Sequence, residues 1–222
     1  MKLYIIPTPI GNLEDITLRA LRILKEVDII FCEDTRTTRN LLKHYEIDKK
    51  CYAYYINNEH RQVEQYIRWL QGGQSAALVS DAGTPGISDP GYLFIRRCLE
   101  SEIQIECLPG ATALIPALIS SGFPCDKFYF HGFLPHKKGK ESTLKMLSER
   151  KETVLFYESP YRLIKTLTLM LQLFAPDRKI CVSRELSKIF EEHFRGTIQE
   201  ALSYFSAKEV KGEIVVSVMG TP

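Results

Sequence analysis

The first half of the chain alternates short apolar runs with amphipathic segments, and this alternation limits its possible folds more than any other feature. Four runs have the length and apolar character of buried strands: residues 3–6, 29–32, 76–79 and 103–108. The segments between them place apolar residues on one face at helical spacing, and Asp15 stands where it would cap the first helix. Strands and helices that alternate in this way form a mostly parallel sheet with helices on both faces.

The second half repeats the alternation after a break at Gly122-Phe123-Pro124. Further strand-like runs lie at residues 128–130, 154–157, 180–183 and 214–218, and residues 190–195 have the pattern of one more strand. We therefore expect an α/β protein with an N-terminal lobe at residues 1–117 and a C-terminal lobe at residues 118–222. The first lobe is expected to hold a mostly parallel sheet and the second lobe a mixed sheet.

Composition excludes several classes of protein without selecting one. The formal net charge of the 222 residues is only +2, so a nucleic-acid partner is neither required nor excluded. The six cysteines form no C-x-x-C pair and no cluster with zinc spacing, and no apolar run approaches the roughly 20 residues of a membrane span. We expect a cytoplasmic protein with reduced cysteines, no metal site and no membrane partner.

Glycine, proline and acidic residues collect directly after the expected strands. The longest such loop, Ser80 to Gly91, has twelve residues that include three glycines, two prolines and two aspartates. A purely structural connection needs about 2–6 residues, and long ordered loops between a strand and a helix usually serve function. Shorter loops of the same kind lie at residues 7–12, 33–36, 109–112, 157–162 and 183–185. Open α/β sheets bind ligands at this edge, so these loops form the candidate site.

Familiar phosphate-binding and catalytic motifs are absent from the sequence. It contains no G-x-x-x-x-G-K-[ST] phosphate loop, no G-x-G dinucleotide motif, no G-x-S-x-G nucleophile elbow and no H-E-x-x-H metal motif. The chemistry must therefore be possible with glycine and proline loops and a few carboxylates. Methyl transfer from a sulfonium donor meets this condition, because the donor is already activated and the enzyme aligns two reactants and removes one proton.

Seven runs of the sequence together resemble a known family. In chain order they read PTPIGNLEDITLRAL, EDTRTTRNLL, SDAGTPGISDPGY, PGATALIPALISSGFP, FHGFLP, FYESPYR and RELSKIFEEHFRG. They are similar to the signatures of the small-subunit ribosomal RNA methyltransferases of the tetrapyrrole methylase superfamily, from Leu3 to about Met219. The resemblance implies two α/β lobes with a cleft between them, a homodimer, and S-adenosyl-L-methionine as methyl donor. It also implies 2′-O-methylation of a cytidine in the decoding region of 16S ribosomal RNA, within the small ribosomal subunit.

The resemblance and the loops together give the residues expected at the site. Those expected to bind the donor are Pro9, Gly11, Asp81, Ala82, Gly83, Thr84, Ile87, Ala111, Thr112, Phe156, Glu213 and Ile214. Glu158 and Glu185 are expected as catalytic carboxylates on the acceptor side, with Arg184 orienting the acceptor phosphate or pairing with a glutamate. Those expected to bind the RNA substrate are Glu33, Asp34, Arg36, Lys137 and Lys138. Asp34 has a second interpretation as a helix cap, and the loop from His136 to Lys140 has one as a solvated loop.

Two other functions fit the same sequence. One is methylation of a small tetrapyrrole or corrinoid, which would need an apolar bowl for a macrocycle, whereas the polar EDTR and RELSK runs suit a nucleic acid better. The other is a non-catalytic RNA-binding or assembly factor that keeps the fold, although binding RNA alone would not need the glycine and proline loop. Donor binding, and methyl transfer to ribosomal subunits or to uroporphyrinogen, distinguish the three.

Overall fold

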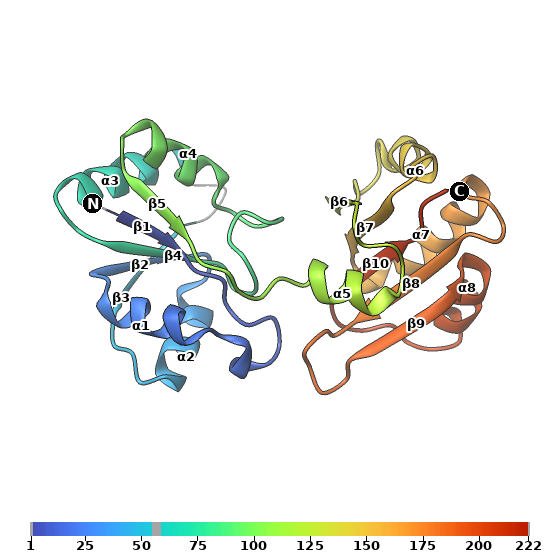
Figure 1. The fold of residues 1–222 in the computed structure, drawn as a ribbon, viewed down its shortest axis with the longest axis horizontal. Coiled ribbons are helices and arrows are strands. Elements are labelled where there is room, and N and C mark those ends of the chain that lie inside the picture. The colour runs from blue at the N-terminus through green and yellow to red at the C-terminus, as the bar shows by residue number, and fades with distance from the viewer. Residues whose placement is uncertain (1, 55–58, 222) are drawn as a thin grey trace. The chain divides into compact units, whose positions relative to one another are not determined.

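The computed structural model describes residues 2–54 and 59–221, and these form two compact units (Figure 1). The first unit is Met1–Thr112 and the second is Ala113–Pro222. The boundary expected between residues 117 and 118 lies inside helix α5 (Leu114–Ser121), which packs on the sheet of the second unit. Pro116 is the third residue of α5, where a backbone N–H has no partner within the helix, so the helix accommodates a proline there.

The first unit is built on a parallel sheet of five strands. The strands are β1 (Lys2–Ile5), β2 (Ile29–Cys32), β3 (Lys50–Ala53), β4 (Ala76–Val79) and β5 (Gln104–Cys107). They lie in the order β3-β2-β4-β1-β5, and each neighbouring pair is parallel. The helices are η1 (Leu13–Asp15), α1 (Leu18–Glu26), α2 (Thr35–His44), α3 (Glu59–Gln71) and α4 (Tyr92–Glu100). Because β4 lies between β2 and β1, the loops that follow these three strands begin side by side.

Alternate side chains of the parallel strands enter two cores, which explains why the strands read as continuous apolar runs. Leu3 and Phe31 pack with Leu70 of α3 in one core. Ile30 packs with Leu24 of α1 in the other core. Figure 1 shows α3 and α4 on one side of the sheet and α1 and α2 on the other. Each fully buried side chain of this size contributes about 1.5–3 kcal/mol to stability.

The first helices begin at polar caps rather than at Asp15. Thr17 caps α1, because its hydroxyl accepts a hydrogen bond from the Ala20 N–H, while Asp15 ends the short helix η1. The expectation that Asp15 caps this helix is therefore wrong. Asp34 caps α2 by accepting from the Arg36 N–H, which confirms its interpretation as a helix cap.

The second unit is built on a mixed sheet of five strands. The strands are β6 (Phe128–Phe133), β7 (Thr153–Glu158), β8 (Lys179–Arg184), β9 (Glu192–Thr197) and β10 (Ile214–Val218). They lie in the order β6-β7-β10-β8-β9, where β6 and β7 are parallel and the other neighbours are antiparallel. The expected α/β fold of two units, with a parallel sheet followed by a mixed sheet, is confirmed.

Helices cover both faces of the mixed sheet. On one face α6 (Lys140–Ser148), α7 (Pro160–Leu173) and α8 (Ile198–Ser206) share a core with Phe156 and Val216. Helix α5 contacts β10 and β8, and its buried Leu114 and Leu118 lie outside that core, so α5 covers the opposite face. Polar strand residues such as Ser183 are buried on the α5 side.

The loop after β5 packs tightly against the loop after β1. A Cβ atom added to Gly110 would lie 2.6 Å from Cβ and 2.9 Å from Cγ of Pro7. The proline ring is rigid and cannot move aside as a long side chain would. Gly110 is therefore required by the close approach of the two loops, and the contact fixes the spacing between them.

We predict that Gly110→Ala lowers the free energy of unfolding by about 1–3 kcal/mol, the usual cost of overpacking a close contact. Urea denaturation measures this cost. In a Pro7→Ala background the same substitution should cost clearly less, because the atoms that clash have been removed. Equal losses in the two backgrounds would show that the Pro7 contact does not constrain this loop.

Candidate functional site

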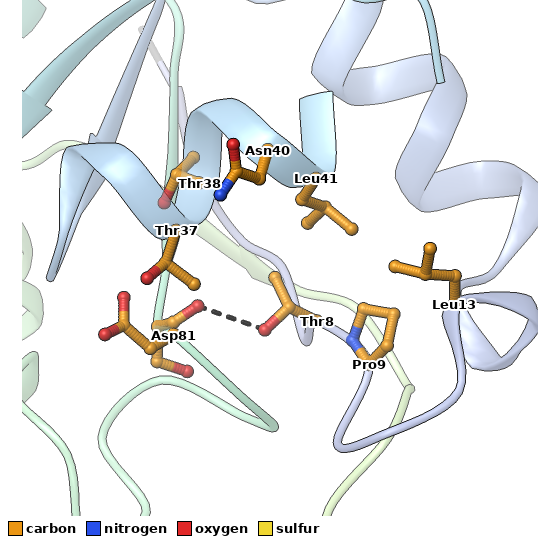
Figure 2. Close-up of a pocket in the computed structure, with 9 residues that line it drawn as sticks. Thr8, Pro9, Leu13, Thr37, Thr38, Asn40, Leu41 and Asp81 are labelled. Carbon is orange, nitrogen blue, oxygen red and sulfur yellow. Dashed lines mark hydrogen bonds between the residues drawn. The ribbon is translucent and has the colours of Figure 1, made fainter. Parts of the chain in front are cut away.

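Three loops at the C-terminal edge of the parallel sheet are joined into one piece. Thr8 and Gly83 exchange two backbone hydrogen bonds of 2.9 Å, and the Thr8 hydroxyl donates to the Ser80 carbonyl at 3.0 Å (Figure 2). The Thr84 hydroxyl donates to the Ala111 carbonyl at 3.0 Å. The loops after β1, β4 and β5 thus hold one another in place at the edge where such sheets bind ligands.

At the centre of this edge, the backbone at Gly83 lies close to Ile10 and Ala111. Its φ of +81° is in the left-handed region, and a Cβ there would lie 3.5 Å from the Ile10 side chain and 3.8 Å from the Ala111 carbonyl. The residues expected to bind the donor gather around it in the first unit. Ala82, Thr84, Ala111 and Thr112 are half-buried, Pro9 is buried, and Gly11, Asp81 and Ile87 are exposed.

A pocket of about 230 Å³ opens beside this edge, between the loop after β1 and helix α2 (Figure 2). Its lining residues are Thr8, Pro9, Leu13, Thr37, Thr38, Asn40, Leu41, Ser80 and Asp81. Of these residues, only Pro9 and Asp81 were expected at the site from the sequence. The sequence feature that could have indicated the other residues is the polar start of α2, where threonine and asparagine follow the acidic pair at Glu33 and Asp34.

Three carboxylates surround the start of α2. The Asp34 N–H donates to Oδ1 of Asp81 at 3.0 Å. The Arg36 side chain pairs with the Asp34 carboxylate at 2.7 Å, and its hydrogen bonds lower the pKa of Asp34 to about 2. Burial raises the pKa of Glu33, and the charge of Asp81 raises it further. Burial also raises the pKa of Asp81. Partial desolvation by the surrounding loops therefore lets Glu33 and Asp81 bind a proton more readily than fully solvated carboxylates do.

Glu158, expected as a catalytic carboxylate, is buried in a network of charges in the second unit. Its side chain is fully buried and lies 3.0 Å from Nζ of Lys140 and 2.8 Å from Nε of Arg162. It also accepts hydrogen bonds from the Thr166 hydroxyl at 2.6 Å and the Ser159 N–H at 2.7 Å. Both oxygens are occupied, so the geometry favours a role in holding the start of α7 to the start of α6.

Glu185 and Arg184 also have partners within the second unit. Oε1 of Glu185 accepts from Lys188 and from the Glu213 N–H, both at 2.9 Å. Burial opposes ionisation of Glu185, but these hydrogen bonds outweigh it and hold its pKa below the usual range. Arg184 pairs with Glu192 at 2.9 Å, which matches the alternative that it pairs with a glutamate. A Cβ on Gly212 would overlap the Glu185 carboxyl, so the turn at Gly212 packs directly against this carboxyl group.

The remaining expected residues of the second unit differ in accessibility. Phe156 and Ile214 point into the core with α6, α7 and α8, so their side chains are not available to a ligand. Glu213 is exposed, as are Lys137 and Lys138. Lys140 of the same lysine loop is turned inward to Glu158 instead. Of the three lysines, only Lys137 and Lys138 are therefore exposed for the expected contact with RNA.

We predict that Glu158→Gln lowers the free energy of unfolding by about 3–5 kcal/mol, because it leaves the buried Lys140 and Arg162 charges uncompensated. Urea denaturation at neutral pH tests this. The matched control is Glu209→Gln, which breaks an exposed pair with Lys211 and should cost about 0–1 kcal/mol. A cost for Glu158→Gln no larger than the control's would show that the network does not stabilise the second unit.

Two further properties hold for the described residues, 2–54 and 59–221. No helix in this part of the chain is long and apolar enough to cross a membrane. Within the same residues, no group of three or more histidine, cysteine, aspartate or glutamate side chains is arranged to hold a metal ion.

The chain matches known proteins over most of its length. It fits the family model of Tetrapyrrole (Corrin/Porphyrin) Methylases over residues 2–202. It is 45% identical over 219 residues to the ribosomal RNA small subunit methyltransferase I of Synechocystis sp., a match that covers 98% of this chain and 78% of that protein. It is 44% identical over 219 residues to the ribosomal RNA small subunit methyltransferase I of Thermotoga maritima, with 99% and 98% covered.

Solved structures of more distant proteins share the fold. A cobalt precorrin-4 methyltransferase superposes with a TM-score of 0.75 at 16% identity, covering 98% of this chain and 94% of that one. A uroporphyrin-III C-methyltransferase from Thermus thermophilus, complexed with S-adenosyl homocysteine, superposes with a TM-score of 0.69 at 17% identity, covering 99% and 97%. The chain therefore belongs to the Tetrapyrrole (Corrin/Porphyrin) Methylases and, within them, to the family of ribosomal RNA small subunit methyltransferases I.

Proposed function

We propose that this chain transfers the methyl group of S-adenosyl-L-methionine to the 2′-hydroxyl of a cytidine in the decoding region of 16S ribosomal RNA. The substrate would be the small ribosomal subunit in the cytoplasm. The observation that carries the proposal is an identity of 44–47% to ribosomal RNA small subunit methyltransferases I. The hydrogen-bonded, glycine-rich edge of the first unit supports the proposal, because backbone N–H and C=O groups there can approach a small ligand closely.

The proposed donor site is the part of this edge where glycine and other small residues leave the backbone accessible to a ligand. Gly11, the segment from Ala82 to Ile87, and Ala111 with Thr112 would contact S-adenosyl-L-methionine. Of the residues expected for the donor in the second unit, Glu213 is exposed, while the side chains of Phe156 and Ile214 are buried in the core of that unit. The donor is a sulfonium, so it supplies an activated methyl group, and the protein contributes alignment.

The proposed reaction is an in-line displacement. The ribose 2′-oxygen forms a bond to the methyl carbon, the carbon–sulfur bond breaks, and S-adenosylhomocysteine leaves as a neutral thioether. The hydroxyl proton must pass to a base. We assign this role to Glu33, a half-buried carboxylate that directly follows β2, the neighbour of β4 in the sheet; burial and the charge of Asp81 also raise its pKa. Glu158, Glu185 and Arg184, which have ion-pair partners, become positioning residues that hold the loops of the second unit.

Positive and apolar surface residues complete the proposal. Arg36, Lys137 and Lys138 are exposed and would contact RNA phosphates, with Asp34 fixing Arg36. Ile115 and Ile119 on α5 and Phe133 on β6 are exposed apolar side chains that would serve a homodimer. These roles rest on exposure and on the family to which the chain belongs.

The decisive experiment supplies radiolabelled S-adenosyl-L-methionine with either small ribosomal subunits or uroporphyrinogen. We expect label in 16S ribosomal RNA, recovered after nuclease digestion as 2′-O-methylcytidine, and none in the macrocycle. Label in uroporphyrinogen alone would identify a tetrapyrrole methylase. Tight donor binding without transfer to either acceptor would contradict the proposal as well.

The donor site has its own test. Gly83→Leu should abolish S-adenosylhomocysteine binding in calorimetry, because a side chain at a φ of +81° is strained and enters the joined loops. Gly73→Leu is the matched control, with a φ of +99° in the same unit and no atom within 4 Å of its Cβ. It shares the backbone strain and should keep donor affinity. If both variants bind equally well, the donor does not lie at Gly83.

A further inference from the structure

The pocket beside α2 is separate from the glycine-rich edge assigned to the donor. Neither Gly11 nor any residue of the segments 82–91 or 109–112 belongs to its lining, which is made of Thr8, Pro9, Leu13, Thr37, Thr38, Asn40, Leu41, Ser80 and Asp81. Its volume of about 230 Å³ is below the range of about 300–1,000 Å³ that is typical for drug-sized ligands. A donor made of adenosine and methionine exceeds it, whereas a single ring with its attachment does not.

The lining of the pocket is divided into an apolar wall and a polar end. Pro9, Leu13 and Leu41 lie on one side, and Thr37 and Asp81 lie on the other (Figure 2). Such a wall suits the faces of a flat ring, and such an end suits the ring's hydrogen-bonding edge. This arrangement fits a nucleobase that has left its stack.

The polar side chains at the pocket have unused hydrogen-bonding capacity. Within the described structure, the side chains of Thr37 and Asn40 make no hydrogen bond. Thr38, only 3% exposed, has a hydroxyl without an oxygen or nitrogen partner in that part of the chain. Asp81 uses Oδ1 to accept from the Asp34 N–H at 3.0 Å, which fixes the carboxylate and leaves Oδ2 for another donor.

We propose that this pocket receives the base of the nucleotide to be methylated and that Asp81 selects cytosine by accepting a hydrogen bond from its exocyclic amino group. This inference deepens the proposed function and depends on it. A carboxylate pairs with the N4 amino group of cytosine, whereas uracil presents a carbonyl oxygen at the same position, which a carboxylate repels. Asn40 and Thr37 offer the further donors and acceptors that the rest of the base edge needs.

The assignment places base recognition and proton removal on neighbouring residues. Asp81 would read the base from the end of β4, while Glu33, at the end of the adjacent β2, would take the ribose proton. Asp81 therefore changes from a donor-binding residue to a specificity residue.

The experiment uses small subunits reconstituted with 16S ribosomal RNA that carries cytidine or uridine at the target position. The wild-type protein should prefer cytidine in kcat/KM. Asp81→Asn presents an amide that donates to the uracil carbonyl, so the preference should fall by about 10-fold or more, consistent with 1–3 kcal/mol of discrimination per base contact. The isosteric amide still accepts from the Asp34 N–H, and a thermal melt verifies folding.

Two further variants test the pocket without touching the carboxylate. Leu41→Trp fills it and should reduce transfer to cytidine by more than 10-fold, and Asn40→Ala should raise KM, with S-adenosylhomocysteine affinity unchanged in both. Leu18→Trp, on an exposed leucine of α1, is the matched control and should keep full activity.

The outcomes separate the pocket from the proposed function. Loss of donor affinity in Asp81→Asn or Leu41→Trp would show that the pocket belongs to the donor and overturn the inference. An unchanged preference for cytidine in Asp81→Asn, whether transfer is normal or uniformly slow, would overturn it too. If the wild-type protein binds donor but methylates no subunit, the proposed function fails, and the base assignment fails with it.

Discussion

The backbone pairing between Thr8 and Gly83 is the constraint on which the site depends. It joins the loops after β1 and β4, two strands that are neighbours in the sheet, and the Thr8 hydroxyl adds a third bond to Ser80. Backbone groups buried at such an edge need partners, and here each loop provides them for the other. With this edge fixed, Asp81 has one position, from which it accepts the Asp34 N–H and so also fixes the start of α2.

The two units use buried charge in opposite ways. In the second unit Glu158 is surrounded by two cations, a hydroxyl and an N–H, so its charge is fully compensated and serves to hold structure. In the first unit neither Glu33 nor Asp81 has an ion-pair partner among the described residues, and the pKa values of both are raised, in each case chiefly by burial. Carboxylates with a raised pKa are the candidates for proton transfer, because their pKa lies nearer to neutral pH than that of a fully solvated carboxylate.

The fold was predictable because its determinants are local, whereas the roles of the charged residues were not. Runs such as 29–32 and 76–79 are buried on both faces, so their composition predicts interior parallel strands. The cap was misassigned because Thr17 and Asp15 are equally suitable in sequence and only the turn η1 decides between them. Glu158 meets Lys140 from 18 positions away, a pairing set by the packing of α6 on α7. Asn40 looks like any solvated helix residue until the loop after β1 is placed beside it.

Under the proposed assignment, the methyl donor and the acceptor base would occupy different parts of the same sheet edge. The part assigned to the donor consists of the backbone and small side chains at Gly83, Ala111 and Thr112. Its proposed role depends on backbone conformation more than on side-chain identity. Four of the residues that line the pocket, Thr37, Thr38, Asn40 and Leu41, are side chains of α2, which can change without moving the strands. A chain path like this one is retained in a cobalt precorrin-4 methyltransferase at a TM-score of 0.75 with only 16% identity. Under this assignment, substitution along α2 would alter the pocket proposed for the base and leave in place the edge proposed for the donor.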